Sequence, residues 1–169
     1  MDAAALRAMQ APIKDRYKTD PKAAIITLKA KGSIDNDGIA CKVETGRALA
    51  VAGLHPATGG SGLELCSGDM LLEALVACAG VTLKSVSTAL EVPLKTGNVT
   101  AEGDLDFRGT LGVDKEAPVG FAEIRLRFDI GTDAPQDKLD LLLKLTERYC
   151  VVYQTIKNGP KISVAMHRV

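Results

Sequence analysis

Cysteines are the side chains of this 169-residue sequence best suited to redox or nucleophilic chemistry. The chain has four of them: Cys41, Cys66, Cys78 and Cys150. Only two histidines accompany them, His55 and His167, and no CxxC pair occurs, so a four-ligand zinc site is not expected. The N-terminus lacks the continuous apolar stretch of a secretory signal. We therefore expect the thiols in a reducing cytoplasm, as core residues, metal ligands or redox-active groups rather than as a disulfide framework.

Three of the cysteines occupy positions that matter for reactivity. Cys78 lies in the middle of a strongly apolar segment, and Cys150 lies 72 residues later at a junction of two expected helices. Taken alone, either would be interpreted as a core residue, because free cysteine is among the most buried residue types. Cys66 immediately precedes an expected helix start, where the helix N-terminus lowers a thiol pKa. Cys41 falls on the inward face of an expected strand and is interpreted as a packing residue.

Several other functions are disfavoured by composition. Lys+Arg and Asp+Glu number 21 each, and aromatic residues make up 4% with no tryptophan, so neither phosphate backbones nor stacked bases are expected partners. The glycine loop 59–62 lacks the Lys-Ser/Thr of a phosphate-binding loop. The most apolar stretch, 70–83, contains Glu73 and is shorter than the roughly 20 residues of a membrane span. No nucleic acid and no membrane are therefore expected as partners.

The hydrophobic pattern predicts an N-terminal arm, residues 1–22, followed by one domain, residues 23–169. Alternation predicts a strand over 24–31, a second after the Asn36-Asp37-Gly38 turn and a third over 48–52. A helix is expected to begin near Ser67, with Asp69 in its first turn, and to continue to Leu90. It is apolar nearly all round, which predicts a helix buried at the centre of the protein.

Strands are expected next at 99–109 and 121–130. Asp133 to Gln136 resembles a capping box before a helix that ends near Tyr149, and a further turn or two follows over 150–157. A last strand is expected at the C-terminus, with Ile162, Val164 and Met166 facing inward. The order βββ-α-ββ-αα-β predicts the α+β class, because the strands cluster instead of alternating with helices.

Two segments resemble the OsmC/Ohr family of osmotically inducible and organic hydroperoxide resistance proteins. The segment 67–78, SGDMLLEALVAC, is similar to the family's PEELLLAALAAC helix, and 149–159, YCVVYQTIKNG, is similar to its second cysteine segment, roughly CPVSNTLRNG. The resemblance extends over about residues 24–168. It implies an OsmC-like intertwined homodimer that reduces organic hydroperoxides, with Cys78 as the peroxidatic thiol and Cys150 as the resolving thiol. No cofactor is implied, only an external dithiol or lipoyl-type reductant.

The activation of Cys78 is where the sequence departs from the family pattern. At an ordinary pKa only roughly 3% of a thiol is ionised at pH 7, so a nearby cation is expected. In peroxidase members an arginine of an N-terminal loop is held by a glutamate ten residues before the cysteine. Here Gly68 stands at that position, Asp69 is the nearest carboxylate and Arg47 is the nearest candidate arginine. Val151 also stands where the family motif has proline.

The sequence thus predicts a cytoplasmic, thiol-dependent peroxidase acting on organic hydroperoxides through Cys78 and Cys150, with Arg47 and Asp69 as candidate activating residues. Two other functions remain open. The first is an OsmC-like protein of weak redox activity that binds a small apolar or electrophilic ligand at the dimer cleft. The second is an interaction protein whose arm, residues 1–22, docks a partner.

Overall fold

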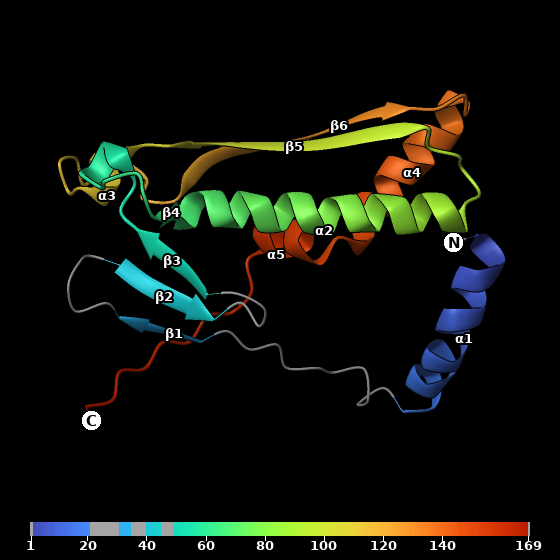
Figure 1. Cartoon of the computed structure of the whole chain (residues 1–169), viewed down its shortest axis with the longest axis horizontal. Coiled ribbons are helices and arrows are strands. Elements are labelled where there is room, and N and C mark those ends of the chain that lie inside the picture. Colours follow the sequence, from blue (N-terminus) through green and yellow to red (C-terminus); the bar gives the residue numbers. More distant parts are fainter. Residues whose placement is uncertain (1, 21–30, 35–39, 45–48, 169) are drawn as a thin grey trace.

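The fold is built around one long central helix. The structure is a computed structural model, which describes residues 2–20, 31–34, 40–44 and 49–168. The α+β class predicted from the sequence is confirmed, and Figure 1 shows β5 and β6 lying along α2, with the small sheet of β1–β3 beyond its other side. In chain order the elements are α1 (Ala3–Thr19), β1 (Lys31–Ile34), β2 (Ala40–Glu44), β3 (Leu49–Gly53), a 3₁₀ turn η2 (Pro56–Thr58), β4 (Leu65–Cys66), α2 (Ser67–Ala89), β5 (Thr96–Leu105), α3 (Phe107–Thr110), β6 (Phe121–Gly131), α4 (Gln136–Tyr149) and α5 (Val151–Asn158).

Helix α2 has one packed side and one open side. Its packed side contacts β5, α4 and α5, and carries the buried residues Leu75, Ala79, Leu83, Val86 and Ser87. On other sides of the helix Leu71 is 41% exposed and Val81 is 72% exposed. The described part of the chain therefore covers only part of this apolar helix. Among the described helices, α2 is also the one whose length and composition would suffice to cross a membrane, a test that core helices pass as well.

Strands β5 and β6 form a two-stranded antiparallel ladder that covers the packed side of α2. Their register runs from Thr96 opposite Gly131 to Leu105 opposite Phe121. The alternation predicted for 121–130 is confirmed, because apolar side chains of β6 pack inward and its charged side chains point to solvent. On the outer face Arg125 makes ion pairs with carboxylates of both strands: Glu102, Asp104 and Glu123.

Two helices close the packed side. Leu142 and Thr146 of α4 are each 1% exposed, and Leu142 joins the core formed with the second half of α2. The predicted capping box at its start is wrong: Pro135 precedes the helix without a side-chain cap, and Asp133 pairs with Lys95 instead. Helix α5 ends at Gly159, whose φ of +47° favours glycine.

The N-terminal arm is a helix attached to one end of α2. Helix α1 continues through Pro12, and its first turns bury Ala3 and Leu6, while Arg7 pairs with Glu91 at 3.3 Å. Figure 1 shows the rest of α1 running away from the body. Most of the strand predicted over 24–31, and the boundary predicted at residue 22, lie outside the described residues.

The small sheet has the order β1-β2-β3-β4, and β2 pairs antiparallel with both β1 and β3. The short strand β4 adds to β3 in parallel and leads directly into α2.

The expected C-terminal strand is not formed. Residues 159–168 have no regular secondary structure, and Ile162, Val164 and Met166 are 80%, 92% and 97% exposed instead of facing inward. A strand needs a neighbour that accepts and donates backbone hydrogen bonds. Within the described part of this chain no strand pairs with the segment, so its alternating pattern has no sheet to join.

Candidate active site

The structure brings Cys78 and Cys150 together although 72 residues separate them in the sequence. Cys78 lies half-buried in the middle of α2, and Cys150 lies at the break between α4 and α5, where it is 1% exposed. The two thiols lie close enough for each to shift the pKa of the other, and both are free thiols. Both belong to a core cluster with Leu75 and Ala79. The two cysteines therefore lie together within one chain, and their redox pairing stays a prediction.

The start of α5 is directed at the Cys78 sulfur. Cys150 is extended, with φ −73° and ψ 107°, and precedes the first helical residue without offering a side-chain cap. The first N–H groups of a helix have no partner inside the helix and attract negative charge. Here the N–H groups of Val151 and Val152 donate to the sulfur of Cys78. The helix start thus provides a site for a thiolate.

These contacts separate the pKa values of the two thiols. Burial raises the pKa of Cys78, but hydrogen bonds from Val152 N–H, the Cys150 thiol, Val151 N–H and the Thr82 hydroxyl outweigh it, so the pKa is lowered. Burial also raises the pKa of Cys150, and the neighbouring Cys78 thiolate raises it further. The pKa of Cys78 therefore lies below that of Cys150, so Cys78 loses its proton more readily.

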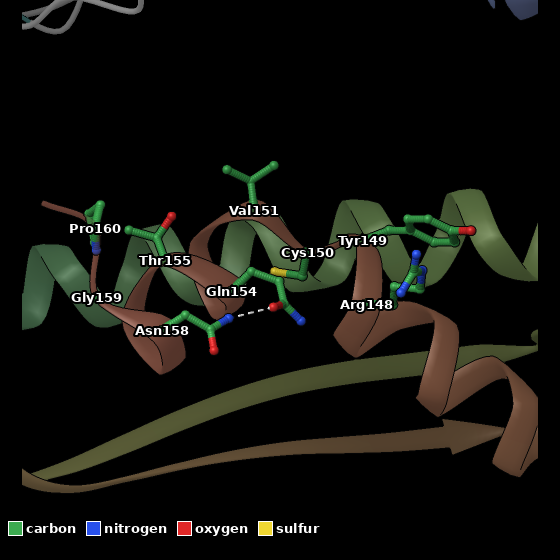
Figure 2. Close-up of a pocket in the computed structure, with 9 residues that line it drawn as sticks. All are labelled: Arg148, Tyr149, Cys150, Val151, Gln154, Thr155, Asn158, Gly159 and Pro160. Atoms are coloured by element: carbon green, nitrogen blue, oxygen red, sulfur yellow. Dashed lines mark hydrogen bonds between the residues drawn. The ribbon is translucent and has the colours of Figure 1, made fainter.

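The α4–α5 junction is fixed by side-chain amides. Gln154 Nε2 donates to the carbonyl oxygen of Glu147 at 2.8 Å, and Asn158 Nδ2 donates to Gln154 Oε1 at 2.7 Å (Figure 2). The first bond ties α5 to the last turns of α4, which holds the start of α5 in place against Cys78. The junction therefore positions the N–H donors as well as Cys150.

A cavity of about 480 Å³ lies beside this junction, and Figure 2 shows the side chains around it. Its lining residues are Arg148, Tyr149, Cys150, Val151, Gln154, Thr155, Asn158, Gly159 and Pro160. The Arg148 guanidinium carbon lies 5.9 Å from the centroid of the Tyr149 ring. The cationic side chain of Arg148 and the Cys150 thiol thus line the same cavity.

Of the other two predicted site residues the structure describes only Asp69, which does not lie beside Cys78. Asp69 is exposed in the first turn of α2, nine residues before Cys78, which places it about 13 Å away along the helix axis. Arg47 lies outside the described residues. The roles predicted for both stay predictions.

Cys66 has a separate environment at the start of α2. It lines a second cavity, of about 360 Å³, together with His55, whose ring stacks on Phe107 at 5.0 Å. Twelve residues separate Cys66 from Cys78, about 18 Å of helix. Within the described ranges, no three His, Cys, Asp or Glu side chains are grouped so that they could hold a metal ion.

Two groups near the Cys78 sulfur were not predicted from the sequence. One is the pair of backbone N–H groups at Val151 and Val152, and the other is the Thr82 hydroxyl. Signals for both were present. Thr82 follows Cys78 by four residues, so the two share a helix face, and a helix start was expected near Cys150. What the sequence lacked was the direction in which α5 points.

The family model for OsmC-like proteins matches residues 60–165. Several solved structures are similar. An OsmC-like protein from Mycoplasma pneumoniae has a TM-score of 0.65 and 14% identity, over 79% of this chain and 89% of that one. The organic hydroperoxide resistance protein OsmC from Legionella pneumophila has a TM-score of 0.61 and 17% identity, over 80% and 92%. OhrB of Bacillus subtilis, also an organic hydroperoxide resistance protein, has a TM-score of 0.52 and 16% identity, over 79% and 93%. No curated protein matches the chain.

Proposed function

Because this chain belongs to the OsmC-like protein family, we propose that it is a thiol-dependent peroxidase that reduces organic hydroperoxides. Cys78 is the attacking thiol and Cys150 the resolving thiol. The observation that carries the proposal is that Cys78 and Cys150 pack together in one core cluster at the start of α5. The pKa of Cys78 is lowered there and that of Cys150 is raised, which supports the same assignment. Some structural neighbours are organic hydroperoxide resistance proteins, which supports the same class of substrate.

The reaction proceeds in two balanced steps. The Cys78 thiolate attacks the terminal oxygen of the hydroperoxide, so that a sulfur–oxygen bond forms and the oxygen–oxygen bond breaks. The leaving alkoxide takes up a proton and becomes an alcohol, and Cys78 becomes a sulfenic acid. The Cys150 thiol then displaces the hydroxyl group from Cys78, giving a disulfide and water. Because Cys150 lies against Cys78 from the outset, the second step requires little movement.

An external dithiol or lipoyl-type reductant completes the proposed cycle. The first thiolate of the reductant attacks the protein disulfide and forms a mixed disulfide with one cysteine. The second thiol of the reductant then breaks the mixed disulfide, so both cysteines are restored and the reductant leaves as its own disulfide. The protein supplies two thiols and the groups that tune them, and the proposal includes no bound cofactor.

We further propose that the working unit is a homodimer in which the partner covers the open side of α2. Val81 on that helix and Val151 at the start of α5 are 72% and 68% exposed, and the C-terminal segment presents apolar side chains at alternate positions. Exposed apolar surface of this kind is typical of a site that contacts another protein chain. Light scattering of the full chain is expected to give twice the mass of one chain, and a monomer at micromolar concentration would contradict this.

The function is tested with cumene hydroperoxide as substrate and dihydrolipoamide as reductant. Cys78→Ser is expected to abolish turnover, because serine is not ionised at neutral pH. Cys150→Ser is expected to consume one equivalent of hydroperoxide and stop at a sulfenic acid that dimedone traps on Cys78. Cys66→Ser is the matched control and is expected to retain activity. Full activity in Cys78→Ser, or no disulfide between Cys78 and Cys150 after treatment with hydroperoxide, would overturn the proposal.

A further inference from the structure

We propose that Thr82 is a further catalytic residue, whose hydroxyl moves its hydrogen bond from the Cys78 carbonyl to the Cys78 sulfur when the thiol ionises. This inference rests on the proposed role of Cys78. It adds a side-chain donor to the backbone donors at the start of α5.

Thr82 lies one helical turn after Cys78 on α2, on the same face of the helix. Its Oγ1 donates to the carbonyl oxygen of Cys78 at 2.8 Å. The same hydroxyl lies close enough to the Cys78 sulfur to lower the pKa of that thiol. A single hydroxyl thus lies between two acceptors of one residue, and it has one proton to give.

The choice between these acceptors depends on the charge of the sulfur. A neutral thiol accepts hydrogen bonds weakly, so the hydroxyl donates to the carbonyl when Cys78 is protonated. A thiolate carries a full negative charge, and hydrogen bonds to charged groups are roughly twice as strong as neutral ones. The hydroxyl therefore turns to the sulfur when the proton leaves.

Leaving the carbonyl costs little. Inside a helix the Cys78 carbonyl also accepts the backbone N–H of Thr82, and a carbonyl oxygen that keeps one partner remains satisfied. Rotation about one side-chain bond is enough for the change. By contrast, the N–H groups of Val151 and Val152 are held by the backbone of α5. Of the two side-chain donors to Cys78 that the described residues provide, Thr82 survives the reaction unchanged, whereas Cys150 is consumed in the disulfide.

The same helix contains a matched comparison. Thr88 makes the same bond as Thr82, from Oγ1 to the carbonyl oxygen four residues earlier, also at 2.8 Å. The acceptor there is Lys84, which has no sulfur. Both Thr82 and Thr88 therefore donate a hydrogen bond to a backbone carbonyl of α2, but only Thr82 has a cysteine four residues before it.

The test measures how the alkylation of Cys78 depends on pH. Iodoacetamide reacts with the full-length reduced protein, and mass spectrometry follows the modification of Cys78 itself. Thr82→Val keeps the shape and removes the hydroxyl, so the midpoint of the pH–rate profile is expected to move to higher pH. The rate at pH 7 is expected to fall threefold to about tenfold, because a thiol of higher pKa is less ionised but somewhat more nucleophilic. Thr82→Ser is expected to restore the profile, and Thr88→Val to leave it unchanged.

An unchanged profile in Thr82→Val, or an equal change in Thr88→Val, would refute the inference. Circular dichroism and urea unfolding establish that each variant is folded, and Thr82→Ala replaces Thr82→Val if valine disturbs the helix. Alkylation involves no hydroperoxide, so its outcome is independent of the proposed peroxidase activity. If the protein shows no peroxidase activity but the alkylation profile still depends on Thr82, the role of Thr82 is supported and the proposed hydroperoxide substrate is rejected.

Discussion

Replacing Val151 with proline tests whether the start of α5 activates Cys78. Proline removes the Val151 N–H, one of the two backbone donors to the sulfur. The position tolerates it, because Val151 is the first residue of α5 and proline is favoured there. Cys150, the preceding residue, already has the extended conformation that a following proline requires. Val151→Pro also restores the residue of the family motif.

The size of the effect follows from one lost hydrogen bond to a charged group, about 1.5 kcal/mol at the lower end of such bonds. The other donors remain, which is why the lower end applies. That free energy corresponds to about a tenfold change in the balance between thiol and thiolate. Little packing is lost, because the Val151 side chain is 68% exposed.

The assay is the ionisation of Cys78, followed by thiolate absorbance and by the pH dependence of alkylation. In Val151→Pro the midpoint is expected to move to higher pH. Val151→Ala is the control, since it keeps the N–H and removes most of the side chain, and it is expected to behave as the parent protein. If proline leaves the midpoint unchanged while α5 stays folded, the helix start does not activate the thiol. An equal effect of alanine would assign the change to packing.

Three further predictions concern the fold. Leu142→Ala is expected to lower the free energy of unfolding by about 3 kcal/mol in urea, since a buried leucine leaves a cavity, and a loss below about 1 kcal/mol would contradict this packing. Arg125→Ala is expected to lower the melting temperature at pH 7. This difference should shrink as the pH falls through the lowered pKa of Asp104, where the carboxylate is protonated, and a pH-independent difference would refute it. Leu6→Ala is expected to release α1, which faster tryptic cleavage after Lys14 would report, with unchanged cleavage as the contrary result.

The sequence was informative wherever local pattern decides structure. Alternation over 121–130 identified β6, and the apolar run from Met70 identified α2 as the central helix. The paired cysteines were found through their flanking motifs. Each of these depends on residues that are close in the chain, so the pattern and the structure report the same local preference.

What could not be predicted depends on contacts between distant segments. The capping box at Asp133 is not formed: α4 begins at Gln136, after Pro135, and the Asp133 carboxylate pairs with Lys95 from the loop before β5. The C-terminal segment has the alternation of a strand, but no strand among the described residues pairs with it. The donors to Cys78 required knowing that α5 starts against α2. The family pattern led us to expect an arginine beside Cys78. The described donors include two backbone N–H groups instead, and a backbone N–H gives no residue-specific signal in a sequence.

The start of α5 also has a consequence for the return half of the proposed cycle. When a thiolate opens a disulfide, the sulfur with the lower pKa departs more readily. The groups that stabilise ionised Cys78 therefore make it the departing atom, and the incoming reductant becomes joined to Cys150. Cys150 lines the cavity at the α4–α5 junction, which offers an approach for that reductant. One helix terminus would thus set the direction of electron flow as well as the reactivity of the first thiol.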